Sequence, residues 1–211
     1  MSDWRVLHKG VIVDFLTFIN KVDNRFVLKG GTALMLCYGL SRFSEDIDLD
    51  GFDRGSFFKD VDSFVRMFSQ KYQGIYARRA KDTDTVKRVF IHYGGMKPLK
   101  IEVSYRKKSI SSSEYCVIGG ILVYTISSIL VMKLNAFSSR DKIRDLYDIT
   151  FLYSNYYGYF SERDLASLRD ILSYKGFEYF DYIVRTQQDD LIDNNQLADA
   201  FISMYYSLGL V

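Results

Sequence analysis

Three carboxylates alternate along one short segment of the chain. Within Glu45–Asp50, the acids Asp46, Asp48 and Asp50 are separated by single apolar residues. On a β-strand, alternate side chains share one face and lie about 7 Å apart at the backbone, so these carboxylates could converge on divalent cations. Such a site is suited to phosphoryl transfer, because the cations neutralise phosphate charge and stabilise the attacking and leaving oxygens. The alternative is a solvated strand edge.

A glycine turn precedes these acids. The apolar run Phe26–Leu28 predicts a short strand, and the pair Gly30-Gly31 lets the backbone turn sharply and approach another group closely. We expect Thr32 to cap a helix over Ala33–Tyr38. A helix N-terminus presents unpaired N–H groups and a partial positive charge, so a phosphate group would fit there.

Two later segments carry further polar residues at informative positions. Alternation over Leu99–Tyr105 predicts a strand with Glu102 on its polar face, where an acid is ordinarily just solvated. A helix predicted over 126–139 places Lys133 within its apolar stripe, so this lysine must reach an anion or extend to solvent. Asp145 and Asp148 lie three residues apart, on one face of the next predicted helix.

Two motifs in this chain resemble those of a known family. Lys29-Gly30-Gly31-Thr32, followed by the segment 42–48 (RFSEDID), resembles the first motif of the DNA polymerase β-like nucleotidyltransferases. More closely, it resembles the AbiEii/AbiGii toxins of bacterial abortive-infection and toxin–antitoxin systems, whose lysine helix and Arg-Asp-x-x-Asp helix are similar to 132–153. The chain departs in having Thr32 where many members have Ser, and in a spacer before Asp46 about one helical turn longer.

The resemblance implies an enzyme that transfers a nucleoside monophosphate from an NTP to an acceptor, with Mg²⁺ or Mn²⁺ as cofactor. It implies that the catalytic residues are Asp46, Asp48, Glu102 and Asp148, of which Asp46, Asp48 and Glu102 would also bind the metal. The residues implied to bind the nucleotide are Lys29, Gly30, Gly31, Thr32, Lys133 and Arg140. Asp145 remains an alternative to Asp148 as the distal acid, and Arg140 could instead form an ion pair.

The expected partners are the NTP, an RNA acceptor such as a tRNA, and a cognate antitoxin. RNA is favoured because three basic groups lie on segments expected near the acids, namely Arg78/Arg79/Lys81, Lys87/Arg88 and Arg106/Lys107/Lys108. Each group could instead be a solvated face. Two alternatives therefore stay open: transfer to a protein acceptor, and a module that binds nucleotide or RNA without turnover.

Composition limits the class of protein. The chain has 211 residues, of which 48% are hydrophobic, enough to build one large domain or two small ones. A formal net charge of +2 permits nucleic-acid binding without requiring it. Two cysteines form no disulfide framework and the chain does not open on a signal peptide, so a cytoplasmic location is expected. The uncharged stretch 116–132 is interrupted by glycines and is too short for a membrane span, so no membrane partner is expected.

These elements predict an α+β fold. We expect a nucleotidyltransferase-like mixed β-sheet flanked by helices over residues 1–124, followed by a helical C-terminal domain, a helical bundle, over 125–211. Strands around Gly119-Gly120 are predicted at 115–118 and 121–124, directly before the lysine helix.

Overall fold

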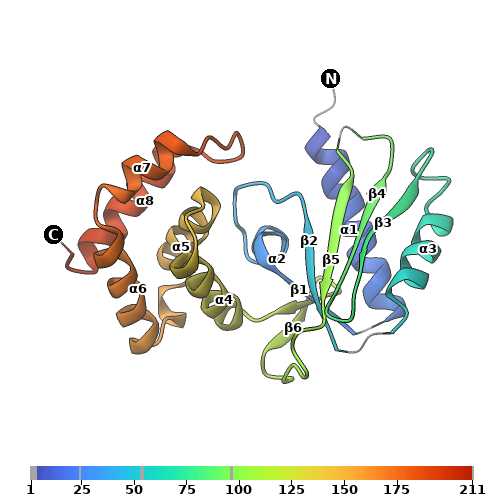
Figure 1. Cartoon of the computed structure of the whole chain (residues 1–211), viewed down its shortest axis with the longest axis horizontal. Coiled ribbons are helices and arrows are strands. Elements are labelled where there is room, and N and C mark those ends of the chain that lie inside the picture. Colours follow the sequence, from blue (N-terminus) through green and yellow to red (C-terminus); the bar gives the residue numbers. More distant parts are fainter. Residues whose placement is uncertain (1–3, 24, 53–54, 96, 211) are drawn as a thin grey trace. The chain divides into compact units, whose positions relative to one another are not determined.

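A computed structural model of the chain describes residues 4–23, 25–52, 55–95 and 97–210. The chain divides into two compact units, Met1–Thr125 and Ile126–Val211 (Figure 1). In the described residues the first unit holds a mixed sheet with helices, and the second is helical. The predicted α+β class is therefore confirmed, while the assignment of residues 1–124 and 125–211 as two domains remains a prediction.

Seven strands form one sheet in the described part of the first unit. Their order across the sheet is β3-β4-β5-β2-β1-β7-β6. The pairs β2/β5 and β1/β7 are parallel and the others are antiparallel. The strands are β1 (Phe26–Lys29), β2 (Ile47–Gly51), β3 (Tyr76–Asp82), β4 (Val86–His92), β5 (Leu99–Ser104), β6 (Tyr115–Ile118) and β7 (Ile121–Tyr124). The hairpin predicted around Gly119-Gly120 is confirmed with the expected bounds.

Helices α1 (Trp4–Val22) and α3 (Phe57–Met67) cover one face of this sheet. The rings of Phe15 on α1 and Phe64 on α3 lie 5.2 Å apart, and Phe57 of α3 lies 5.8 Å from Phe26 of β1. All four side chains are almost fully buried, and burial of such aromatic area is a large part of the core energy. We call this side of the sheet the helix-covered face.

Helix α2 (Gly30–Cys37) begins immediately after β1, earlier than expected. Lys29 is therefore the N-cap residue, and the prediction that Thr32 caps the helix is wrong. Thr32 is 1% exposed, and its hydroxyl contacts the backbone carbonyl of Asp46 and lies 2.9 Å from the Ser44 hydroxyl. The threonine thus fastens the first turn of α2 to the segment that carries the acids.

The second unit consists of helices in its described residues. They are α4 (Ile126–Ser139), α5 (Ile143–Tyr156), a 3₁₀ turn (Tyr157–Tyr159), α6 (Glu162–Lys175), α7 (Tyr179–Thr186) and α8 (Asn194–Ser207). Ser161 and Asp164 form a reciprocal capping box at the start of α6, which satisfies two otherwise unpaired backbone donors. Within the described ranges, no helix has the length and hydropathy needed to span a bilayer.

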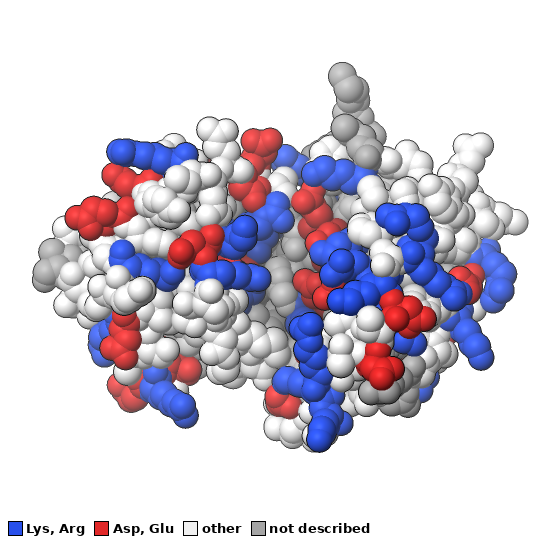
Figure 2. Space-filling model, in the orientation of Figure 1, with Lys and Arg blue, Asp and Glu red and all other residues white. Residues whose placement is uncertain are grey.

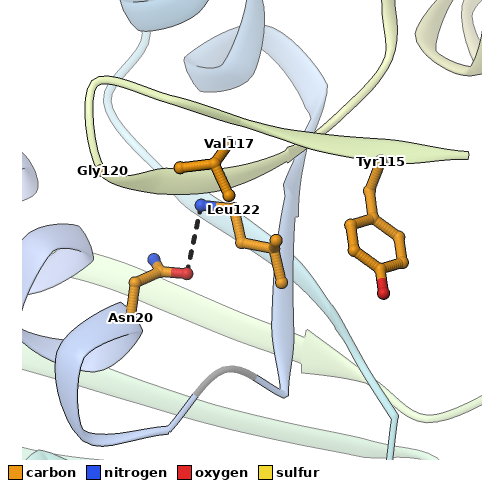
Figure 3. A pocket seen from close by; sticks show the side chains of 5 residues that line it. All are labelled: Asn20, Tyr115, Val117, Gly120 and Leu122. Atoms are coloured by element: carbon orange, nitrogen blue, oxygen red, sulfur yellow. Dashed lines mark hydrogen bonds between the residues drawn. The ribbon is translucent and has the colours of Figure 1, made fainter. Parts of the chain in front are cut away.

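Asn20 near the end of α1 connects that helix to the β6/β7 hairpin (Figure 3). Its amide nitrogen donates to the Leu16 carbonyl at 2.7 Å, and its oxygen accepts from the backbone N–H of Leu122 at 3.1 Å. The bond joins segments 102 positions apart in the sequence. It borders a cavity of about 450 Å³ lined by Asn20, Tyr115, Val117, Gly120 and Leu122.

We predict that Asn20→Ala lowers the free energy of unfolding by about 1–3 kcal/mol, because a buried backbone donor loses its partner. Urea unfolding monitored by circular dichroism measures the change. Asn155 offers a matched control, since it also donates to the carbonyl four residues earlier but is exposed. Asn155→Ala should change stability by less than about 0.5 kcal/mol. Equal effects of the two substitutions would mean that the bond to Leu122 stabilises nothing.

Candidate active site

The predicted acids meet on the face of the sheet opposite α1 and α3. In the parallel pairing of β2 with β5, Asp48 lies directly beside Glu102. Asp46 precedes Asp48 by two residues, just before β2 begins. We call this side the acid face and define it by Asp48, Asp50, Lys100 and Glu102, which alternate with buried apolar residues on β2 and β5.

Cations from adjacent strands lie next to these acids. The ammonium of Lys100 is 2.6 Å from Asp46 Oδ2, and the guanidinium of Arg88 on β4 is 2.5 Å from Glu102 Oε2. The negative charges of Asp46, Asp48 and Glu102 all raise the pKa of Lys100. Burial alone would lower the pKa of this lysine, but its hydrogen bond to Asp46 and the three negative charges raise it. Lys100 therefore remains protonated in the protein.

Asp50 has a structural role that the sequence pattern did not indicate. It is 4% exposed, it binds the Lys29 ammonium at 2.5 Å, and it accepts a hydrogen bond of 2.9 Å from the Tyr124 hydroxyl. Asp50, the third acid of the alternating run, thus joins two neighbouring strands, and it is not among the residues predicted to bind metal. Lys29, which was predicted to bind nucleotide, is a partner of Asp50 in this structure and links β1 to β2.

Asp48 lies in an environment that opposes its ionisation. Burial raises the pKa of its carboxyl, and the charges of Asp46 and Glu102 raise it further, while Lys100 and Lys29 partly oppose the shift. The ionised form is thus disfavoured in the folded protein. A cation close to Asp48 would reverse this penalty.

The glycine pair lets α2 approach the acids. Gly30 has φ of 77°, a conformation that favours glycine, and a Cβ there would lie 3.2 Å from Asp48 Oδ2. A Cβ on Gly31 would lie 2.7 Å from the guanidinium of the buried Arg42 and 2.9 Å from Ser44 Oγ. Gly30 therefore lets the N-terminus of α2 lie against Asp48, and Gly31 leaves room for Arg42 and Ser44. That Gly30, Gly31 and Thr32 bind phosphate remains a prediction.

His8 supports the same segment and was not assigned a role from sequence. It is 1% exposed on α1; its Nε2 lies 2.7 Å from the carbonyl oxygen of Glu45 and its Nδ1 lies 2.5 Å from the Tyr93 hydroxyl. Because a carbonyl only accepts, Nε2 carries the proton and Nδ1 accepts from Tyr93. Burial lowers the pKa of His8, which favours this neutral form. The sequence signal that could have indicated this role is the position of His8 on the buried stripe of α1, next to Val11 and Ile12.

The donor set suits a hard divalent cation. Among the described residues, no three His, Cys, Asp or Glu side chains already form a group that could hold a metal. Lys100 instead binds Asp46, and Arg88 binds Glu102. These contacts show that the carboxylates favour positive charge beside them. Carboxylate oxygens are the ligands that Mg²⁺ and Mn²⁺ prefer. Asp46, Asp48 and Glu102 would hold such an ion, which would neutralise phosphate charge when bound.

The remaining predicted residues lie in the second unit. The Lys133 ammonium on α4 is 2.5 Å from Asp148 on α5, and the two side chains are 11% and 0% exposed. Arg140 binds Asp145 through two nitrogens, at 2.6 and 2.9 Å. The ion-pair alternative for Arg140 is therefore what the structure contains. Roles of Lys133 and Arg140 in nucleotide binding, and of Asp148 or Asp145 in catalysis, remain predictions.

Comparison with known proteins identifies the family. The sequence profile of the nucleotidyl transferase AbiEii toxins, described as belonging to a type IV toxin–antitoxin system, matches residues 18–204. The chain belongs to this family. It is a nucleotidyltransferase of the AbiEii toxin type, and the expectation drawn from the two motifs is confirmed.

Solved structures agree with this assignment. JHP933 from Helicobacter pylori is 30% identical to this chain, with a TM-score of 0.80 over 99% of this chain and 93% of JHP933. A second H. pylori structure is also 30% identical, with a TM-score of 0.81 over 99% and 96% of the two chains. MenT4, a nucleotidyltransferase toxin from Mycobacterium tuberculosis, shares the fold at 18% identity, with a TM-score of 0.50 over 90% of this chain and 70% of MenT4. A comparison with curated sequences finds no match.

The pair Lys133–Asp148 generates a prediction about stability. Lys133→Met leaves a fully buried carboxylate without its main cation, so it should lower the free energy of unfolding by about 3–5 kcal/mol. The double substitution Lys133→Met/Asp148→Leu should restore much of this loss. A double-mutant cycle in urea measures the coupling between the two residues.

The control is the exposed pair Arg185–Asp181 in the same unit, whose side chains are 79% and 67% exposed. Its coupling should be below about 0.5 kcal/mol. Additive losses at Lys133 and Asp148 would show that the two residues act independently.

Proposed function

We propose that this AbiEii nucleotidyltransferase transfers a nucleoside monophosphate from an NTP to an RNA acceptor such as a tRNA. Its cofactor would be Mg²⁺ or Mn²⁺, and the protein would act as the toxin of a toxin–antitoxin pair. The observation that carries the proposal is the pairing of Asp48 with Glu102, beside Asp46 and the N-terminus of α2. This arrangement combines acids for a cation with N–H groups for a phosphate.

In the proposed reaction, a hydroxyl oxygen of the acceptor attacks the α-phosphorus of the NTP. The bond from that phosphorus to the bridging oxygen breaks, and pyrophosphate leaves. The hydroxyl proton passes to a carboxylate, for which Glu102 is the candidate because Arg88 holds it on the acid face at 25% exposure. Asp46 and Asp48 would orient the triphosphate through the divalent ion, and Gly30, Gly31 and Thr32 would cradle it.

Strand alternation separates the basic residues that favoured RNA. Arg78 pairs with Phe90, and Lys81 pairs with Arg88, which places both on the acid face. Arg79 and Lys87 belong to the other face, where their charges lie 4.7 and 5.0 Å from the ring centre of Phe58 on α3. Figure 2 shows basic side chains around acidic ones over the strands β5 and β4. An RNA that reaches the acids would therefore contact Arg78 and Lys81 rather than Arg79 and Lys87.

Lys107, the middle residue of the third basic group, has local partners. Lys107 binds Glu114 at 3.0 Å, and its ammonium lies 4.8 Å from the ring centre of Tyr124. This lysine supports the segment that leads into the β6/β7 hairpin. The proposal therefore relies on Arg78 and Lys81 and not on Arg106, Lys107 and Lys108 as a group.

We predict that Asp48→Asn lowers nucleotidyl transfer at least about 10²- to 10³-fold, the loss typical of removing one group that stabilises transferred charge. The assay incubates full-length protein with each labelled NTP, Mg²⁺ and total cellular RNA. Because the folded protein disfavours ionised Asp48, the metal-free variant should melt at or above the temperature of the native protein. Full transfer by a folded Asp48→Asn protein would remove this acid from the mechanism.

The same extract separates the alternatives. Label in polypeptide and none in RNA would favour a protein acceptor, and would leave the family assignment unchanged. Saturable binding of NTP without label in either fraction would favour a binding module. Label in RNA that disappears with Asp48→Asn supports the proposed reaction.

The division of basic residues between two faces gives a further prediction. Arg78→Ala/Lys81→Ala should weaken RNA binding and reduce the slope of log affinity against log salt by about 1.4, because two phosphate contacts to a single strand are lost. The matched control is Arg79→Ala/Lys87→Ala, which removes the same charge from the helix-covered face. Fluorescence anisotropy at several salt concentrations measures both slopes. Equal losses in the two variants would contradict an RNA path over the acid face.

A further inference from the structure

Lys100 binds one of the carboxylates that are predicted to hold the divalent cation. Its ammonium lies 2.6 Å from Asp46 Oδ2, and it shares the acid face with Asp48 and Glu102. The side chain is 30% exposed and that of Asp46 is 45% exposed, so this contact lies at the solvent side of the acids. By contrast, Asp50, which is nearly buried, is fastened to Lys29 and Tyr124. Of these two ion pairs, Lys100–Asp46 is the one that can open without disrupting the core.

An ammonium and a divalent ion compete for the same carboxylate oxygen. A magnesium ion binds carboxylate oxygens at about 2.0–2.1 Å and demands near-octahedral geometry. An ammonium in hydrogen-bond contact with that oxygen fills one of the directions needed and repels the ion. Binding of the metal through Asp46 Oδ2 therefore requires Lys100 to leave that oxygen. Because Lys100 lies on β5 two residues from Glu102, its ammonium would still be near the acids and could bind an anion there.

We propose that Lys100 is a resident counter-cation of the acid site, which keeps divalent-ion affinity low until a triphosphate is bound. This proposal rests on the metal site of the proposed function. In the free protein Lys100 neutralises Asp46 and holds it in place. When the NTP brings a divalent ion, the ammonium moves from Asp46 to the phosphate oxygens. Lys100 is in this sense a positioning residue that couples metal binding to nucleotide binding.

The experiment is a titration of the full chain with Mn²⁺ alone, with free Mn²⁺ measured by electron paramagnetic resonance. Lys100→Gln should bind Mn²⁺ about tenfold more tightly than the native protein, because a repelling charge is removed. Lys100→Arg, which keeps the charge, should retain the weak native affinity. Lys97→Gln is the matched control, because Lys97 pairs with the neighbouring acid Glu45 at 2.7 Å but is 61% exposed. It should leave Mn²⁺ affinity unchanged.

A second measurement uses thermal stability and does not depend on enzymatic activity. Without metal, Lys100→Gln should melt at a lower temperature than the native protein, since the carboxylates then repel each other, and Mn²⁺ should raise its melting temperature more than that of the native protein. With a non-hydrolysable NTP present, the tenfold advantage of Lys100→Gln should disappear.

Unchanged Mn²⁺ affinity in Lys100→Gln, or equal tightening by Lys100→Arg, would overturn this proposal. Neither outcome would affect the transfer assay with Asp48→Asn. Conversely, absence of transfer to RNA or protein would count against the proposed reaction and would leave the Mn²⁺ comparison valid.

Discussion

Carboxylates on neighbouring strands repel one another, and the acid face is tolerated because the adjoining strands supply cations beside them. Strand β2 lies between β1 and β5, and each neighbour contributes a lysine to an acid next to it: Lys29 to Asp50 and Lys100 to Asp46. The next strand, β4, contributes Arg88 to Glu102. The mixed strand order therefore matters beyond topology, because it interleaves positive and negative side chains on one surface. Two unit charges about 4 Å apart interact by about 1 kcal/mol in water and about 4 kcal/mol near a protein surface, so these contacts offset part of the repulsion between the carboxylates.

The backbone before β2 is fixed by side chains from elements far away in the sequence. His8 of α1 donates to the Glu45 carbonyl, and Thr32 of α2 contacts the Asp46 carbonyl. Gly31 leaves room for Arg42 and Ser44 beneath the same segment. Two helices, α1 and α2, thus position the acids through contacts that involve none of the carboxylates themselves. Such support allows the acids to keep their geometry when the cations around them exchange, which is what a site with a mobile ligand requires.

Sequence reasoning worked where the signal was local. Alternation and the Gly119-Gly120 turn predicted β6 and β7 with their observed bounds, and the apolar stripe that contains Lys133 predicted α4. It also placed Glu102 on the polar face of β5. It failed where a partner comes from another strand or helix. Nothing local distinguishes Asp50 from Asp48, because the difference is made by Lys29 and Tyr124, which only the sheet order brings to Asp50. The misassignment of Thr32 has the same origin, since its hydroxyl bonds outside its own helix.

The electrostatic state of Asp48 bears on the choice between an enzyme and a binding module. The folded protein disfavours the ionised form of this acid, so keeping an aspartate there costs stability that an asparagine would not. A module that held nucleotide through N–H groups and phosphate charge alone would gain nothing from that cost, because a carboxylate repels phosphate. In the proposed function, a divalent cation would lie between this acid and the triphosphate. A cation in that position would also polarise the phosphates toward attack. The environment that makes ionised Asp48 unfavourable in the free protein therefore favours a transferase over a binding module.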